Sequence, residues 1–251
     1  MQGGGSCAKS IESKIQTPSN LHLLTFTSQL FEPLDLIYDS LFMSNQCLYL
    51  PKLYGIYKTF DAIDFGILPH KFVIKTNHDC GGVVMVQDKE AFLQDGISQA
   101  RDKIMWHLQH NYYEQYREWH YKDIEPRIFV EELLGECIED FRFHCFNGEV
   151  AFIQVANATH TRNDVFDTQW QKLDFMYLNL PSDIPPKKPT KFHLMLHLAN
   201  LLSAPMNYVR VDLYCVDSRV YVGELTFTPN GGTGKFSPQS FDRYFGDLWH
   251  I

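Results

Sequence analysis

Two acidic side chains near the carboxyl-terminal end of the sequence are placed where they could bind a cation. Residues 208–236 read YVRVDLYCVDSRVYVGELTFTPNGGTGKF, two alternating stretches joined by a polar turn and followed by a glycine-rich segment. With a three-residue turn at 217–219, counting outward places Asp212 opposite Glu224. Facing carboxylates repel each other unless a proton or a cation lies between them, and Mg²⁺ is the cation that carboxylates and phosphates most often share. The alternative is a solvated pair of surface acids, which is common in proteins.

The same count places Arg210 opposite Thr226, on the face of the hairpin that carries the two acids. A basic and a hydroxyl side chain therefore lie next to the carboxylate pair.

A glycine-rich turn between two apolar stretches is a second candidate site, in the segment FVIKTNHDCGGVVMV at 72–86. Phosphate loops of the Walker and Rossmann types join a strand to a helix, whereas this turn joins strand to strand. We therefore expect a flap whose glycines let backbone N–H groups approach a phosphate. Lys75, at the end of the first strand, could reach the same phosphate. The alternative is an ordinary hairpin with a surface lysine.

The segment RIFVEELLG at 127–135 is the third candidate. An apolar strand that ends in two acids and a glycine could act as a hinge whose backbone binds the edge of an adenine. The alternative is a core strand in which Glu131 and Glu132 are solvated.

The periodicity of the apolar residues predicts the elements that position these segments. They are strands at 72–75 and 83–86, a helix within 89–118, a strand at 127–135, a hairpin around Asn147-Gly148, a long loop or lid at 158–190, a helix at 192–202 and the hairpin described above. Antiparallel strand pairs separated by helices favour an α+β fold.

Composition excludes several classes of protein. The 251 residues carry a net charge of -8, which argues against a nucleic-acid partner. No apolar run reaches the roughly 18 residues of a membrane span, and the amino-terminal residues lack the apolar core of a secretion signal. The six cysteines include no pair at zinc-site spacing, so we expect reduced thiols and a cytoplasmic location.

Taken in order, these motifs resemble the ATP-grasp superfamily, and more closely its TupA-like branch, which is tied to teichuronopeptide and surface-polysaccharide synthesis. The resemblance covers residues 50–250 and is carried by LPHKFVIKTNHDCGG, EWHYKDIEPRIFVEELL, EDFRFHCFNGEV and YVRVDLYCVDSRVYVGELTF. It implies two α+β lobes with antiparallel sheets that enclose ATP, together with Mg²⁺. The domains would be a flexible leader at 1–20, a diverged segment at 21–68, a central lobe with the glycine flap at 69–134 and a carboxyl-terminal lobe with the metal-binding hairpin at 135–251.

The resemblance also implies a role for each candidate residue. Lys75 would contact the α- and β-phosphates, under a flap that includes Asn77, His78, Gly81 and Gly82. The adenine hinge would be Glu131, Glu132 and Leu133. Arg142 would clamp the γ-phosphate or an acyl phosphate, so that Arg142 and Lys75 are the catalytic candidates. Asp212 and Glu224 would bind the metal, and Thr226 stands where the family usually has an asparagine ligand, with Asn230 as a possible substitute.

The reaction implied is ATP-dependent ligation of a carboxylate to an amine through an acyl phosphate, with a small-molecule or glycan-precursor carboxylate and an amine as partners. One alternative is an ATP-dependent kinase, although the H-R-D and D-F-G motifs are absent. The other is a non-catalytic nucleotide-binding protein. Two features would permit it: Thr226 replaces the usual asparagine, and the lysine-bearing segment expected from the resemblance is not recognisable in residues 21–48.

Overall fold

The computed structural model describes residues 48–136, 138–157 and 159–249, and the side chains from residue 50 onward. The contacts divide the chain into two compact units. The first includes Cys137–Ile251 and the end of Thr27–Leu50, and the second includes Pro51–Glu136. The segment expected as a leader at 1–20, and residues 21–47 of the diverged segment, lie outside the described residues.

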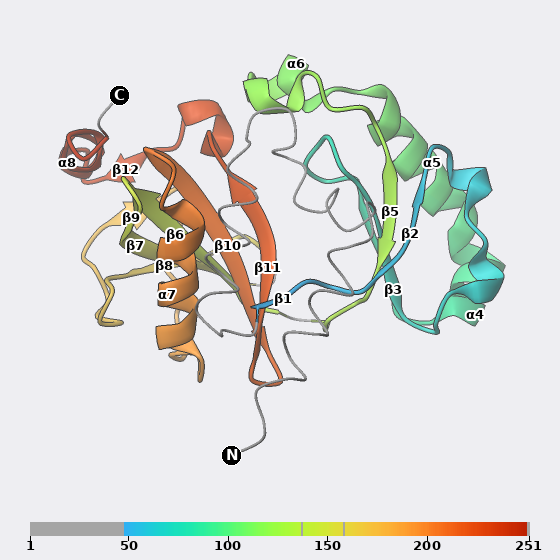
Figure 1. Cartoon of the computed structure of the whole chain (residues 1–251), viewed down its shortest axis with the longest axis horizontal. Helices are drawn as coiled ribbons and strands as arrows, with labels where there is room; N and C mark the ends of the chain where they lie inside the picture. The colour runs from blue at the N-terminus through green and yellow to red at the C-terminus, as the bar shows by residue number, and fades with distance from the viewer. Residues whose placement is uncertain (1–47, 137, 158, 250–251) are drawn as a thin grey trace. The chain divides into compact units, whose positions relative to one another are not determined.

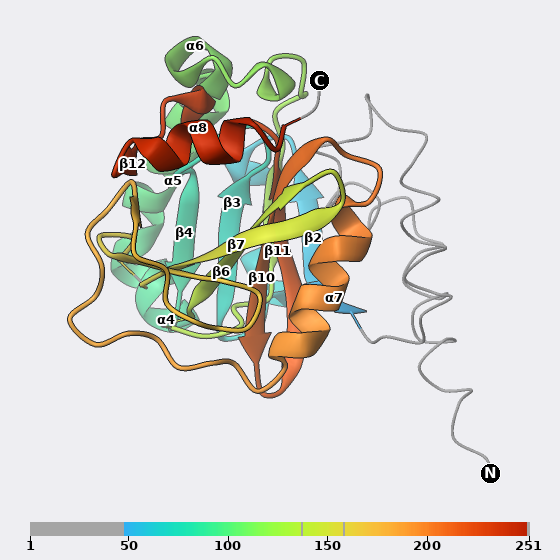
Figure 2. The same cartoon turned by 90° about the vertical axis from the view of Figure 1, so that its left-hand side faces the viewer.

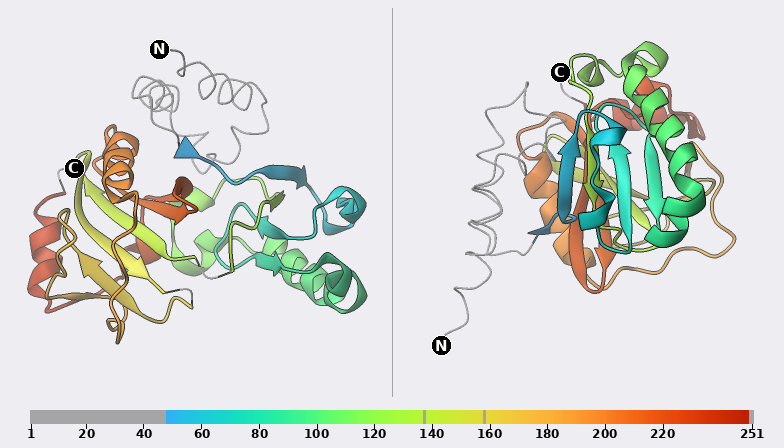
Figure 3. Two further views of the ribbon diagram at one scale, coloured as in Figure 1. Left: turned by 90° about the horizontal axis from the view of Figure 1, so that it is seen from below. Right: turned by 90° about the vertical axis from the view of Figure 1, so that its right-hand side faces the viewer.

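The second unit is built on a four-stranded antiparallel sheet with the strand order β2-β5-β3-β4. Three of its strands, β2, β3 and β5, are labelled in Figure 1. Its strands are β2 (Leu53–Tyr57), β3 (Phe72–Thr76), β4 (Val83–Val86) and β5 (Ile128–Glu131). Helix α5 (Ile97–Gln109) contacts β3 and β4, as the right-hand view of Figure 3 shows. The alternation of β3 is clear, because Phe72 and Ile74 are fully buried against this helix layer.

The single helix expected within 89–118 is instead a series of short elements. They are α4 (Lys89–Ala91), the π-turn η3 (Phe92–Gly96), α5, α6 (Tyr112–Tyr116) and the 3₁₀ turn η4 (Trp119–Tyr121), and two further 3₁₀ turns, η1 (Phe60–Ala62) and η2 (Phe65–Ile67), precede β3. The break after Gln109 has a local cause. The side chain of Asn111 accepts a hydrogen bond from the N–H of Tyr113, at 2.9 Å, and so caps a new helix.

The first unit is built on a six-stranded sheet with the order β1-β11-β10-β6-β7-β8, antiparallel except between β1 and β11. Its strands are β1 (Leu48–Tyr49), β6 (Asp140–Phe146), β7 (Glu149–Ala156), β8 (Asn163–Phe166), β10 (Tyr208–Val216) and β11 (Arg219–Thr226). The hairpin predicted at Asn147-Gly148 joins β6 to β7, and both turn residues have positive φ, at 50° and 82°.

Helix α7 (Phe192–Ser203) covers one face of this sheet, contacting β6, β7 and β10 (Figure 2). It confirms the helix predicted at 192–202, and Met195, Leu198 and Ala199 are its fully buried stripe. The other face carries an aromatic core with Phe152, Phe175 and Tyr177. The elements near this second core are β9 (Met176–Tyr177), the turn η5 (Pro229–Gly232), β12 (Phe236–Ser237) and α8 (Ser240–Gly246).

The segment expected as a loop or lid at 158–190 is partly ordered as sheet. β8 pairs with β7, and β9 pairs with β12. All four residues of β8 are buried, so this strand adds an edge to the sheet rather than hanging over it. Among the described residues, no helix has the length and apolarity that crossing a membrane would need.

Candidate functional site

The pairing of the carboxyl-terminal hairpin places Asp212 opposite Glu224 and Arg210 opposite Thr226, as the sequence predicts. The turn is different, because it has two residues rather than three. Asp217 and Ser218 both have positive φ, at 48° and 60°, which is the geometry of a two-residue hairpin turn. The register would then be off by one, but a β-bulge between Asp212 and Leu213 restores it.

Gly223 is the extra residue of the bulge, since Leu213 pairs with Val222 and Asp212 pairs with Glu224. A Cβ at Gly223 would lie 2.8 Å from Cε2 of Tyr214, closer than side chains pack. Glycine therefore permits the bulge that brings the two acids to the same place on the sheet.

The cation that joins this carboxylate pair is Arg210. Its Nε and Nη2 donate to the two oxygens of Asp212, each at 2.7 Å, and Nη2 also donates to Oε1 of Glu224 at 2.5 Å. The Thr226 hydroxyl donates to the same Glu224 oxygen at 3.1 Å. The sequence predicts Mg²⁺ as the cation between these acids; in the structure a guanidinium two residues before the aspartate contacts both, and a fork-shaped contact of this kind is a strong form of ion pair.

A second arginine extends the arrangement on strand β6, which pairs with β10. Arg142 lies opposite Asp212 in the register, donates to Asp140 at 2.7 Å through Nε, and comes within 3.9 Å of Asp212. We call Asp140, Arg142, Arg210, Asp212 and Glu224 the acid–arginine cluster. The sequence reasoning selected three of its five residues. The sequence also places Arg210 on the face of the acids, without a role. The alternation that puts Asp140 with Arg142 on one strand face is the signal that could have found Asp140.

The electrostatics of the acid–arginine cluster follow from its burial. The side chain of Asp212 is 2% exposed, whereas that of Glu224 is 39% exposed. Burial raises the pKa of Asp212 well above its usual range, and Arg210 opposes this effect. Burial also acts to raise the pKa of Glu224, but Arg210 and the surrounding hydrogen bonds outweigh it, so the pKa of Glu224 is lowered. The two shifts have opposite directions because Asp212 is more deeply buried than Glu224.

The acid–arginine cluster fits a divalent cation by its chemistry. Three carboxylates face two guanidinium groups, which leaves one uncompensated negative charge when every acid is ionised. Oδ1 of Asp140 is buried and has no hydrogen-bond partner among the described residues. Carboxylate oxygens are the ligands that Mg²⁺ prefers, and Asp212 and Glu224 are the residues that would hold it. Thr226 is committed to Glu224 through its hydroxyl.

In the second unit, Lys75 is paired with an acid rather than open to solvent. Its ammonium group forms an ion pair with Oε1 of Glu131 on the neighbouring strand β5. The side chains of Lys75 and Glu131 are 28% and 7% exposed, and Oε2 of Glu131 is buried with no partner among the described residues. The Lys75 ammonium group is therefore partly exposed, and the Glu131 carboxylate that neutralises it is buried.

The glycine-rich turn is anchored rather than loose. The carboxylate of Asp79 contacts the hydroxyl of Thr76 and Nδ1 of His107 on α5, and its side chain is 5% exposed. We call Thr76, Asp79 and His107 the Asp79 brace. Asn77 holds the other side of the turn, since its amide accepts from Arg127 N–H at 2.7 Å and donates to a backbone carbonyl in the same segment.

The two glycines of this turn have different surroundings, because Gly82 is buried beside Thr76, Asp79 and His107 whereas Gly81 is open to solvent. Gly81 has a φ of 108°, which side chains rarely adopt, and it is exposed. A Cβ at Gly82 would lie 2.9 Å from Oδ1 of Asp79 and 3.1 Å from Cβ of His107. Within the described residues, neither glycine N–H donates a hydrogen bond. The phosphate-binding role expected for this turn stays a prediction.

The remaining candidates occupy less open positions. His78 is 1% exposed, and burial lowers its pKa, so it is a neutral interior residue. The N–H of Glu132 donates to the carbonyl of Lys52 at 2.8 Å, and its side chain accepts from the Lys52 N–H at 3.1 Å. The backbone N–H of Leu133 has no acceptor among the described residues. Leu133 is thus the part of the predicted hinge whose backbone is open.

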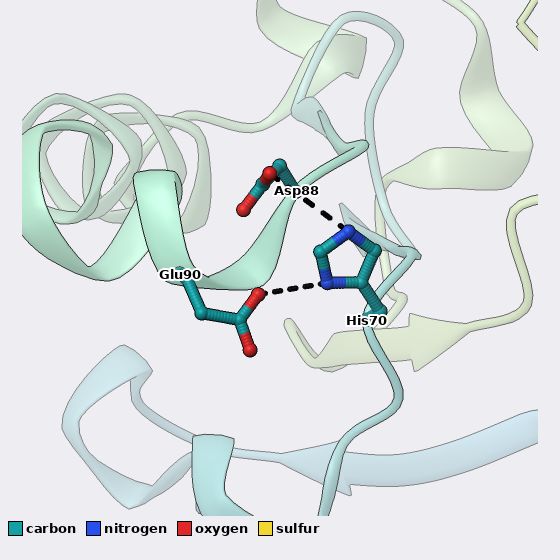
Figure 4. A group of neighbouring side chains, drawn as sticks. All are labelled: His70, Asp88 and Glu90. Carbon is teal, nitrogen blue, oxygen red and sulfur yellow. Dashed lines mark ion pairs between the residues drawn. The ribbon is translucent and has the colours of Figure 1, made fainter.

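A separate group of possible metal ligands lies on the surface of the second unit (Figure 4). Nδ1 of His70 is 2.7 Å from Glu90, and Nε2 is 3.8 Å from Asp88. Each carboxylate thus faces a different ring nitrogen, whereas a metal ion takes one nitrogen of a histidine. All three side chains are more than half exposed. The contacts are those of a surface ion pair, and no metal centre is assigned here.

Several solved structures of known proteins are similar to this chain. Solved structures similar to this chain include a D-alanine–D-alanine ligase from Bacillus anthracis complexed with ATP, at 16% identity and a TM-score of 0.43, covering 76% of this chain and 51% of that one. An L-amino acid ligase from Bacillus licheniformis is similar at 14% identity and a TM-score of 0.45, over 79% and 43% of the respective chains. A D-alanine–D-alanine ligase from Helicobacter pylori is similar at 14% identity and a TM-score of 0.40, and the match covers 85% of this chain and 56% of that one.

This chain matches only about half of the length of each of these ligases. No curated protein matches the sequence. The model of one protein family, described as TupA-like ATP-grasp, matches residues 39–250. That match covers most of the chain and includes both units with their antiparallel sheets. The protein belongs to the TupA-like ATP-grasp family and has an α+β fold of the ATP-grasp type.

Proposed function

We propose that this protein is an ATP-dependent carboxylate–amine ligase that attaches an amino acid or another amine to a carboxylate on a cell-surface polysaccharide precursor. The family supports the reaction class. Within the structure, the proposal depends on one observation: Asp212 and Glu224 meet on paired strands beside Arg210, on the same face as Arg142 and Asp140. Such a group can hold charged phosphoryl oxygens, and the transfer of a phosphoryl group is catalysed by charge and position.

In this scheme each candidate residue has a stated role. Lys75 and the N–H groups of Gly81 and Gly82 would bind phosphate oxygens of ATP, and Leu133 would meet the adenine edge through its backbone. Mg²⁺, held by Asp212 and Glu224, would neutralise phosphate charge. Arg142 would orient the transferred phosphoryl group, because Asp140 fixes its guanidinium through Nε. None of these steps needs a nucleophile from the protein.

The proposed reaction has two steps. The acceptor carboxylate attacks the terminal phosphoryl group of ATP and forms an acyl phosphate, with ADP as the leaving group. The amine then attacks the acyl carbon, and phosphate leaves as the amide forms. Arg142 and Arg210 can stabilise negative charge in both steps, and their buried acids keep them aimed without reorganisation.

The direct test measures products rather than binding. The purified protein is incubated with MgATP, uronic-acid or other glycan carboxylates and a panel of amino acids, and ADP, phosphate and amide are quantified. We expect that ADP release over many turnovers needs both the carboxylate and the amine, because the acyl phosphate formed in the first step must be consumed by the amine. A stable phosphorylated product formed without amine would identify a kinase. Nucleotide binding without turnover over the whole panel would favour the non-catalytic alternative.

That alternative has an observation in its favour. Arg210 already contacts both metal-ligand candidates, and Thr226 offers a hydroxyl where the family usually has an amide. Isosteric variants test the metal assignment directly. Asp212→Asn and Glu224→Gln should abolish the Mg²⁺-dependent part of ATP stabilisation in a thermal melt, measured with and without EDTA. Equal stabilisation of wild type and both variants would show that these acids hold no metal.

A further inference from the structure

One ion pair in the second unit joins two residues for which the sequence predicts separate roles. Strands β3 and β5 are antiparallel neighbours, in which Lys75 pairs with Phe129 and Val73 pairs with Glu131. Lys75 and Glu131 are therefore diagonal neighbours on one face of the sheet, at a separation that long side chains span. The ammonium group of Lys75 donates to Oε1 of Glu131. Strand register thus brings the expected phosphate contact and an expected hinge residue together.

The Lys75–Glu131 pair lies on the face of this sheet that points away from the core beneath α5. Alternation decides this, because successive side chains of a strand point to opposite faces. Ile74 and Val130, which precede Lys75 and Glu131 in their strands, are fully buried in the core cluster that includes Ile104 of α5. On the opposite face the Lys75 side chain is 28% exposed, so an anion can reach it.

The Glu131 carboxylate depends on Lys75 for its counter-charge. Its side chain is 7% exposed, and among the described residues Lys75 is the only basic side chain that forms an ion pair with it. Oε2 of Glu131 is buried and has no hydrogen-bond partner among those residues. Removing the cation from a buried carboxylate costs far more than removing it from a solvated one. The pair therefore keeps the flexible side chain of Lys75 in one place.

Lys75 keeps hydrogen-bonding capacity for a ligand while it is paired. An ammonium group has three N–H donors, and within the part of the chain that the structure describes its one acceptor is Glu131. Lys89 of the same unit is different, because its Nζ donates to the backbone carbonyls of Phe65 and Leu68, at 3.3 and 2.7 Å. Lys89 therefore fastens a loop, whereas Lys75 has donors left for an anion.

Holding Lys75 in advance has a consequence for anion binding. The lysine side chain is a flexible four-carbon stem, and ordering such a side chain when a ligand arrives weakens binding. A side chain that already has a fixed acceptor loses less freedom, so the same contacts give a higher affinity. Glu131 thus supports a bound phosphate through its acceptor oxygen, although its negative charge by itself repels that phosphate.

We propose that Glu131 is a positioning residue, whose carboxylate holds the ammonium group of Lys75 in place for the phosphate oxygens of ATP. This inference rests on the proposed function, in which Lys75 contacts those oxygens. It removes the Glu131 side chain from the adenine contact that the resemblance implies, and it leaves that contact to the backbone at Leu133.

Two substitutions separate the acceptor from the charge. Glu131→Gln and Glu131→Met both remove the negative charge, but only glutamine keeps an oxygen that can accept from the Lys75 ammonium group. The repulsion between Glu131 and phosphate is lost in both variants, so the difference between them reports the acceptor alone. Lys75 is partly exposed, so neither variant leaves a fully buried charge without a partner. Glu131→Leu takes the place of the methionine variant if that protein does not fold.

The same two substitutions are made in a Lys75→Met background, where the acceptor has no ammonium group to hold. The matched control is an exposed ion pair of the same unit, Lys71 with Glu136, whose side chains are 53% and 56% exposed and whose charged atoms are 3.4 Å apart. Glu136→Gln and Glu136→Met repeat the change of residue type outside the proposed site.

The measurement is the affinity of each protein for MgATP, by isothermal titration, and for adenosine, by ligand-detected NMR. Adenosine carries the base and the ribose but no phosphate. We expect Glu131→Met to bind MgATP about 5-fold more weakly than Glu131→Gln, the effect of ordering one long side chain, with equal affinities for adenosine. The difference should vanish in the Lys75→Met background, and both Glu136 variants should match wild type.

Three results would overturn the inference. The first is MgATP binding by Glu131→Met that equals or exceeds that of Glu131→Gln, which denies the acceptor a role. The second is the same difference with adenosine, which assigns the side chain to the nucleoside. The third is a difference that persists in the Lys75→Met background. Each leaves the ligase proposal standing if the wild type binds MgATP and forms the amide, whereas a wild type that binds neither ligand removes both.

Discussion

The two candidate sites are held in different ways. The acid–arginine cluster lies on paired strands, and its charges come from residues two apart on one strand or opposite each other on the next. The glycine-rich turn is held by side chains distant in sequence, since Asp79 contacts His107 on α5 and Asn77 contacts Arg127. The first site is fixed by strand register and the second by tertiary contacts. A substitution in the first site should therefore lower the stability of the whole unit, whereas a substitution in the second should increase only the local mobility of the turn.

The largest effect is expected from removing the central cation of the first site. Arg210→Met leaves Asp212 and Glu224 facing each other without their counter-charge, and breaking a buried ion pair costs about 3–5 kcal/mol of folding free energy. Arg210→Lys keeps the positive charge but loses the two-pronged contact of the guanidinium, so its stability should lie between those of wild type and Arg210→Met. The free energy of unfolding in urea measures this, with Arg243→Met as control. Arg243 is 89% exposed beside Asp247.

If Arg210→Met unfolds no more easily than Arg243→Met, the acid–arginine cluster is not a unit, and the contrast drawn above is wrong.

A smaller, local effect is expected in the second site. Asp79→Ala removes the acceptor shared by Thr76 and His107, and each buried polar group left without a partner costs about 1–3 kcal/mol. Amide hydrogen exchange should accelerate in the turn at 77–82 while β5 stays protected. Asp102→Ala, at an exposed position on the same helix α5, is the matched control. Uniform acceleration over the whole sheet of the second unit would contradict a local role for the Asp79 brace.

Adding one methyl group tests the packing of the same turn. In Gly82→Ala the new Cβ would collide with Oγ1 of Thr76 and press on Asp79 and His107, and overpacking of this kind costs about 1–3 kcal/mol. Gly246→Ala is the control, because nothing lies within 4 Å of a Cβ there. Urea denaturation of the two variants measures the difference. An equal change in unfolding free energy at both glycines would mean that the turn accommodates a methyl group at residue 82 without a clash.

The smallest effect is a dependence on pH in the first unit. His144 is 2% exposed, accepts from or donates to Tyr208 and Gln154, and burial keeps its pKa well below the usual 6.5. The unfolded chain therefore takes up a proton that the folded chain does not. Stability from this residue is present above pH 6.5 and is lost as pH falls below it, by up to about 1.4 kcal/mol per pH unit.

His144→Gln should remove this slope, so the loss of stability between pH 6.5 and 5.5 should be about 1 kcal/mol smaller than in wild type. Denaturant unfolding at the two pH values measures it. His197→Asn, exposed on α7, should keep the wild-type slope. An identical slope in wild type and His144→Gln would show that His144 is protonated in the folded protein.

The sequence predicts the carboxyl-terminal hairpin well, because strand alternation is local and the pairing of Asp212 with Glu224 follows from it. The predicted turn is wrong by one residue, and the pairing survives only because the bulge at Gly223 compensates. The helix at 192–202 and the hairpin at Asn147-Gly148 are equally local and are confirmed. The helix within 89–118 is broken, since the capping by Asn111 competes with periodicity.

Composition and alternation by themselves determined the α+β class, the strand pairs and the shared face of the acids, because each depends on neighbours within one hairpin or helix. Tertiary structure decided which charges neutralise which. Arg210 joins Asp212 and Glu224, and Lys75 joins Glu131. Such partners are chosen by burial, since a charge removed from water must find its opposite wherever the packed chain brings one.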